Sequence, residues 1–119
     1  MADANNQVYL ESGSVFIYEL PGHDAVQMWF RYSITVSLTR AQARLLATAH
    51  ECPLHESGRR EPRLAIGRAR FFPLTGFPGR WSFSALSGSL EYSTSLSTDE
   101  KEQIITLLLR EADKEQVAA

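Results

Sequence analysis

The clearest hydrophobic pattern in the chain is an alternation over residues 28–38. Every even-numbered residue of this segment is apolar, and the odd-numbered positions hold Trp29, Arg31, Ser33, Thr35 and Ser37. Successive side chains of a β-strand point to opposite faces of the sheet. The pattern therefore predicts one strand of eleven residues, with one covered face and one mostly polar face.

Two helices are predicted from capping residues and from apolar spacing. Thr39 can accept an amide hydrogen bond at the start of a helix that Pro53 would end near Glu51. Ser97 and Glu100 have the spacing of a capping box, in which each side chain satisfies a terminal amide. The apolar stripe expected on the helix that follows consists of Ile104, Ile105, Leu108, Leu109 and Ala112.

Four other segments combine β-branched or aromatic residues with neighbouring turn signals. They are residues 14–20, which an earlier stretch at 8–10 could extend, 64–72, 81–85 and 90–96. The last two are predicted to form a hairpin because their link is short. The order β-β-α-β-β-β-α predicts an α+β fold in which a single antiparallel sheet of about five strands carries two helices on one face. No internal repeat is evident.

Length and composition predict a small soluble domain. The chain has 119 residues, of which 44% are hydrophobic and 22% charged. We expect one domain over residues 1–119, with short flexible ends at about 1–6 and 114–119. No apolar run is long enough to span a bilayer, so no membrane partner is expected. The polar start of the chain and its single cysteine favour a cytoplasmic location.

Charge is unevenly distributed along the chain, although the formal net charge is only -2. Residues 1–30 contain four acids and no Lys or Arg, whereas residues 31–80 contain nine arginines and three acids. Residues 81–119 contain seven acids and three bases. The cationic centre therefore needs an acidic counterpart, which is either an outside partner or the acidic ends of this chain, within a monomer or across a dimer.

Residues 50–56, HECPLHE, are the weak candidates for a metal site. A zinc-binding HExxH helix needs histidines four apart, whereas His50 and His55 are five apart and Pro53 interrupts the helix between them. A loop site that joins His50, Cys52 and His55, with His23 from elsewhere, stays as an alternative, as does a nucleophilic role for Cys52. The expectation is a structural segment with no metal and no cofactor.

Standard catalytic motifs are missing from the sequence. No GxSxG, P-loop or GxGxxG pattern occurs. A small nuclease-like enzyme would need a carboxylate, a histidine and an arginine to converge, and Glu91, His23 and Arg70 are the residues that could do so. Since sequence alone shows no convergence, a non-enzymatic protein is the favoured interpretation.

An arginine-rich stretch interleaved with aromatic residues gives the main functional prediction. Guanidinium groups bind carboxylates and phosphates, and exposed rings can stack on bases. In 64–72 the arginines share a parity with aliphatic residues, which predicts either a bulge at Gly67 or arginines at the rim of the sheet. The predicted contacts are Arg59, Arg60, Arg63, Arg68 and Arg70, with Trp29 and Arg31 as a second patch.

The resulting hypothesis is a small regulatory or inhibitor-type binding protein that docks on a protein or ribonucleoprotein partner. Its size is typical of proteins from mobile elements or from defence and counter-defence systems. Nucleic-acid binding through the same arginine and aromatic region is the alternative. A homodimer formed by pairing of sheet edges also stays open, because the sequence does not show which edge is exposed.

Overall fold

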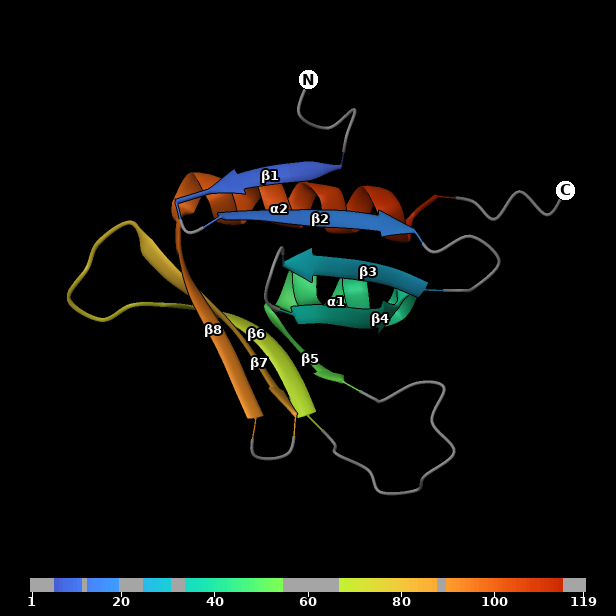
Figure 1. Ribbon diagram of the computed structural model, residues 1–119, viewed down its shortest axis with the longest axis horizontal. Helices are drawn as coiled ribbons and strands as arrows, with labels where there is room; N and C mark the ends of the chain where they lie inside the picture. Colours follow the sequence, from blue (N-terminus) through green and yellow to red (C-terminus); the bar gives the residue numbers. More distant parts are fainter. Residues whose placement is uncertain are drawn as a thin grey trace, which may run out of the picture.

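The computed structural model describes residues 6–11, 13–19, 25–30, 34–54, 67–87 and 90–114. Four strands, a helix, four strands and a second helix follow one another along the chain (Figure 1). The first half contains β1 (Gln7–Leu10), β2 (Gly13–Glu19), β3 (Ala25–Phe30), β4 (Ile34–Thr39) and α1 (Arg40–Ala49). The second half contains β5 (Glu51–Leu54), β6 (Gly67–Pro73), β7 (Arg80–Ser87), β8 (Leu90–Ser97) and α2 (Thr98–Ala112).

The strands form two antiparallel four-stranded sheets in place of the single sheet of about five strands that the sequence predicted. The N-terminal sheet has the order β1-β2-β3-β4, and the C-terminal sheet has the order β5-β6-β7-β8. The predicted α+β class is confirmed, but the prediction of one sheet is wrong. Each half repeats the same plan, in which a meander of four strands leads into a helix.

The predicted strand over residues 28–38 is in fact the hairpin of β3 and β4. Phe30 lies opposite Ile34, and Met28 lies opposite Val36. Because these paired positions are both even-numbered, even residues face the interior on both strands. The even-numbered apolar positions therefore continue from β3 into β4 on the same face, which explains why the sequence pattern is typical of one long strand.

The segment after α1 also differs from the prediction. Residues 51–54, expected to be a helix end and loop, form β5, and Pro53 is accommodated because β5 is an edge strand. β6 begins at Gly67, so the predicted start at residue 64 lies outside the described residues. Along β6, Ala69 and Phe71 are buried and Arg68 is exposed, so the arginines lie on the outer face.

Both predicted helix starts are confirmed. Thr39 accepts a hydrogen bond from the amide of Gln42, whose side chain in turn accepts one from the Thr39 amide. Ser97 and Glu100 form the same reciprocal arrangement at the start of α2. Each helix therefore begins at the residue after its preceding strand, and the cap fixes the direction in which the chain leaves the sheet.

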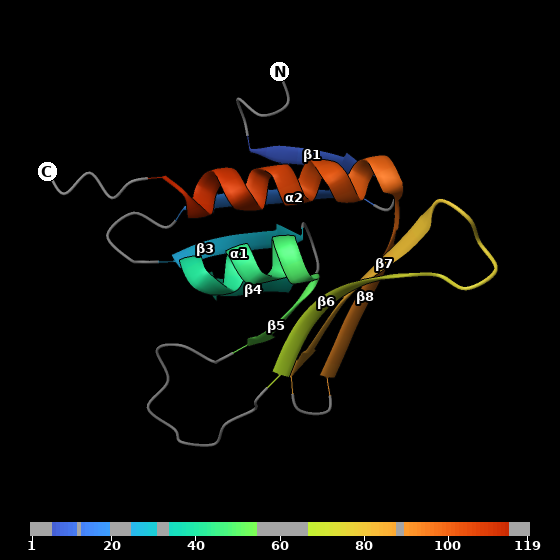
Figure 2. The same ribbon diagram turned by 180° about the vertical axis from the view of Figure 1, so that it is seen from behind.

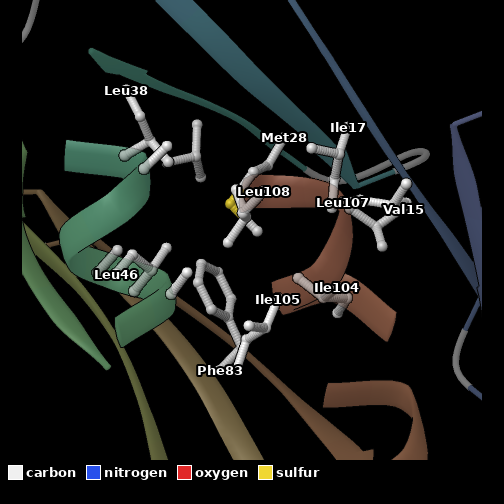
Figure 3. Close-up of a cluster of buried hydrophobic side chains, with 14 of the residues drawn as sticks. Val15, Ile17, Met28, Leu38, Leu46, Phe83, Ile104, Ile105, Leu107 and Leu108 are labelled. Atoms are coloured by element: carbon white, nitrogen blue, oxygen red, sulfur yellow. The ribbon is translucent and has the colours of Figure 1, made fainter. Parts of the chain in front are cut away.

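The two helices lie side by side against one face of the N-terminal sheet, as the opposite views in Figures 1 and 2 show. Apolar side chains from this sheet, from both helices and from the C-terminal sheet meet in the core (Figure 3). Met28, Leu46, Phe83 and Leu108 represent these four sources, and all are fully buried. In the part of the chain that the structure describes, neither helix has the length and apolar character of a bilayer-crossing segment.

An aromatic cluster joins the two sheets. The ring of Phe30 on β3 stacks on Phe83 of β7 with centroids 5.0 Å apart, and it contacts Tyr92 of β8 at 5.1 Å. Phe71 of β6 packs against the same Phe83 ring at 5.3 Å. The inner face of the C-terminal sheet is thus held against the end of β3, while its outer face points away from the core.

Candidate docking surface

The predicted contact residues that the structure describes lie on two different sheets. Arg68 and Arg70 lie on β6 of the C-terminal sheet, and Trp29 lies on β3 of the N-terminal sheet. The other predicted contacts lie outside the described residues; they are Arg31, Arg59, Arg60 and Arg63. Within the described ranges, the arginines of β6 and Trp29 therefore occupy the outer faces of separate sheets.

Several described arginines form ion pairs with acids of the same chain. Arg68 bonds Glu51 at 2.9 Å, and the side chains of both residues are about half exposed. Arg80 reaches Glu11 of the acidic N-terminal segment at 3.1 Å. Three further pairs of this kind within the described residues are Arg44–Asp113, Arg40–Glu19 and Arg110–Glu111. The acidic ends of the chain thus neutralise part of its cationic centre.

Arg70 is held differently from these arginines. Its guanidinium carbon lies 4.7 Å from the centroid of the Phe72 ring, which is the geometry of a cation–π contact. Its Nε is buried and has no hydrogen-bond partner within the described part of the chain. Arg70 lies between Glu51 and Ser84 in the sheet register, so it belongs to a face of mixed charge.

Of the three residues proposed for acid–base chemistry, the structure describes Glu91 and Arg70. Glu91 accepts a hydrogen bond from the Ser84 hydroxyl at 3.2 Å, and Ser84 lies opposite Arg70. These two candidates therefore share the outer face of the C-terminal sheet. His23 lies outside the described residues.

Two of the residues considered for a metal site, His50 and Cys52, lie at the junction of α1 and β5. His50 ends α1 with a φ of 67°, and its ring meets the ring of Trp81 edge-on at 5.7 Å. Cys52 is buried in β5, and His55 lies outside the described residues. No three metal-ligating side chains come together within the described segments.

Burial makes Cys52 a poor nucleophile. Loss of hydration raises the pKa of its thiol from 9.0 to about 11, and the neighbouring Glu51 carboxylate acts in the same direction. We predict that an aromatic disulfide reagent at pH 8 will modify Cys52 roughly 100-fold more slowly in the native protein than in urea. Equal rates would show that the thiol is accessible in the folded chain.

The same pKa shift predicts how stability changes in alkali. Because the pKa is raised on folding, the unfolded chain ionises first. The contribution of Cys52 to stability is therefore complete below pH 9.0 and is lost as the pH rises towards 11. A Cys52→Ala variant should lose less stability over this interval than the parent protein, as measured by urea unfolding.

The outer face of the N-terminal sheet carries a group of aromatic side chains. Phe16 on β2 and Trp29 on β3 are direct cross-strand partners, and their rings stack with centroids 5.2 Å apart. Tyr9 on β1 is 65% exposed and Trp29 is 41% exposed. Tyr18 follows Phe16 on the same face. Both helices cover the other face of this sheet (Figures 1 and 2), and the alternate residues Val15, Ile17 and Met28 are buried.

Polar side chains on this face are tied to one another across the strands. The Tyr18 hydroxyl donates to the Gln27 amide oxygen at 3.3 Å, and the Gln27 amide nitrogen donates to the Ser37 hydroxyl at 3.0 Å. Gln7 donates in the same way to Ser14 at 3.0 Å. These side chains are therefore held in place by contacts within the sheet.

The described residues of this face carry no formal charge, and we call them the aromatic face. They are Gln7, Tyr9, Ser14, Phe16, Tyr18, Ala25, Gln27, Trp29, Thr35, Ser37 and Thr39. Sequence reasoning identified Trp29 but missed Tyr9, Phe16 and Tyr18. In residues 14–19 aliphatic and aromatic side chains alternate, so both faces look apolar. The sequence signal that could have identified this face is that the aromatic residues of the segment occupy even-numbered positions and the aliphatic residues odd-numbered positions.

Comparisons of the chain with protein-family models, with curated proteins and with solved structures found no match.

Proposed function

We propose that this chain is a non-enzymatic binding protein of the regulatory or inhibitor type, and that the aromatic face docks on a protein partner. The observation that supports this most strongly is the combination of exposed aromatic rings with an absence of charge over the described residues of the face. Cores of protein–protein interfaces are enriched in Tyr, Trp and Phe and depleted of charged residues.

The organisation of the face supports the same proposal. Trp29 and Phe16 stack near its middle, and hydroxyl and amide groups surround them. Large rings held by their neighbours lose little side-chain entropy on binding, and such residues often dominate the energy of an interface. A partner of matching chemistry would offer an uncharged surface with apolar and hydrogen-bonding groups.

Nucleic acid is the less favoured partner. Binding to phosphates needs cationic groups that are available to release counterions. Arg68 and Arg80 already bond Glu51 and Glu11, and the described residues of the aromatic face supply no positive charge. The outer face of the C-terminal sheet, with Arg70 over Phe72, is the surface on which nucleic-acid binding would depend.

The test uses Trp29→Ala as the interface variant and Phe77→Ala as its control, because Phe77 is 63% exposed in the loop between β6 and β7. A protein captured from a nuclease-treated extract is purified separately, and its dissociation constant is measured by calorimetry. Trp29→Ala should weaken binding by about 30-fold or more, since a hot-spot truncation costs roughly 2 kcal/mol or more. Phe77→Ala should leave binding unchanged.

Two results would contradict the proposal. The first is a purified partner that binds the parent and Trp29→Ala proteins equally well. The second is tight binding of a fluorescent single-stranded oligonucleotide, with a steep salt dependence that becomes flatter when Arg68 and Arg70 are replaced by alanine. The second result would transfer the function to the outer face of the C-terminal sheet.

A further inference from the structure

Within the described residues the two sheets have four edge strands, and β8 is the least protected of them. β1 and β5 have four residues each, and β5 contains Pro53, which has no amide hydrogen to donate. β4 has six residues, whereas β8 has eight and pairs only with β7 within the described residues. A long edge exposes a row of unpaired amide and carbonyl groups that can bind another strand.

The sequence of β8 lacks the features that usually prevent such pairing. It contains no lysine and no proline, and Glu91 is its only charged residue. Ser93 and Ser95 are exposed on the outer face, while Thr94 and Leu96 are buried on the inner face. The strand is therefore regular, alternating and almost uncharged.

We propose that β8 pairs in an antiparallel manner with β8 of a second copy of this chain, across a two-fold axis. The two C-terminal sheets would then form one continuous sheet of eight strands. The aromatic face lies on the other sheet, so this inference is independent of the proposed docking function.

The charge pattern of β8 fits a second copy. A two-fold axis perpendicular to the sheet keeps the inner faces of the two copies on the same side. The pairing of the two β8 strands can then be centred on either of the two middle residues, Thr94 or Ser93. With Thr94 on the axis, Glu91 faces Ser97 and Ser93 faces Ser95. With Ser93 on the axis, Glu91 faces Ser95. Neither register places like charges opposite each other, and both pair hydroxyl side chains across the new contact.

Cysteine cross-linking tests the pairing directly. Ser93→Cys and Ser95→Cys variants are oxidised separately and as a mixture, and Cys52 gives little background because it is buried. A disulfide dimer that forms only in the mixture is expected for the axis at Thr94. A dimer formed by Ser93→Cys alone is expected for the axis at Ser93. Absence of a cross-link in all three samples overturns the proposal.

Sedimentation equilibrium provides the second measurement. The double variant Ser93→Glu, Ser95→Glu places like charges opposite each other in both registers, so dimerisation should weaken at least about tenfold. Gln103→Glu with Thr106→Glu is the matched control, because it adds the same charge at exposed positions of α2. Equal dimerisation of the two double variants, or a parent protein that stays monomeric at about 1 mM, overturns the proposal.

Discussion

Replacing Arg40 with methionine is expected to lower the free energy of unfolding by about 3–5 kcal/mol. Arg40 is the first residue of α1, and its side chain is only 10% exposed. It forms an ion pair with Glu19 at the end of β2 and donates to the carbonyl oxygen of Glu111 at 2.9 Å. It also donates to the carbonyl oxygen of Lys114 at 3.2 Å.

The large effect follows from the groups that the substitution would leave behind. The carbonyl oxygens of the last turn of α2 carry the negative end of the helix dipole, so a cation beside them is stabilising. The fully buried Glu111 carboxylate accepts from the Glu19 amide at 3.0 Å and from the Lys114 ammonium at 3.0 Å. Arg40 thus belongs to a buried network that ties β2 and both helices together.

The measurement is urea unfolding followed by circular dichroism, with Arg44→Met as the control. Arg44 lies one turn further along α1 and bonds Asp113 at 2.8 Å, but its side chain is 48% exposed. Solvent screens such a pair, so its loss should cost less than about 1 kcal/mol. Equal destabilisation by the two substitutions would show that burial of Arg40 contributes nothing to stability.

The contrast between Arg40 and Arg44 shows why the charge pattern of the sequence was only partly informative. Segregation of charge along the chain raised the idea that the acidic ends could pair with the arginine-rich centre. No local pattern singles out Arg40, because its burial depends on the contact between α1 and the end of α2. That contact joins residues about 70 positions apart in the chain.

Elements defined by local chemistry were predicted well. Both helix starts follow from capping residues that act within four positions of the chain, and the link between β7 and β8 is short enough to impose a hairpin. The division into two sheets was not predicted, because it depends on pairing between strands. Even-numbered residues of β3 pair with even-numbered residues of β4, so the hydrophobic pattern concealed the boundary between these two strands.

The candidate surface was predicted only at Trp29, for a similar reason. Alternate positions that are all polar mark the exposed face of a strand clearly, but β2 has apolar residues at both odd and even positions. Cross-strand register is what brings Phe16 next to Trp29 and Tyr18 next to Gln27. Sequence reasoning can therefore propose the exposed residues of one strand, whereas a surface built from four strands requires the pairing order.

Replacing Phe83 with alanine is expected to cost about 3–5 kcal/mol of unfolding free energy, the usual range for a fully buried aromatic side chain. Phe83 is completely buried, and its ring contacts Phe30 of the N-terminal sheet and Phe71 of its own sheet. Figure 3 shows this ring pointing from β7 towards Leu46 and Ile105 of the two helices. Its removal opens a cavity where both sheets and both helices meet.

The expected result of urea unfolding for Phe83→Ala is a lower midpoint with an unchanged slope, because the amount of surface exposed on unfolding stays the same. Phe83→Leu should recover about half of the loss, since most of the cavity is refilled. Phe77→Ala removes the same side chain from an exposed loop and should change stability by less than about 0.5 kcal/mol. If Phe83→Ala is no more destabilising than Phe77→Ala, the two sheets do not share the core described above. A second unfolding step confined to Phe83→Ala would instead show that this ring is what couples the two halves into one transition.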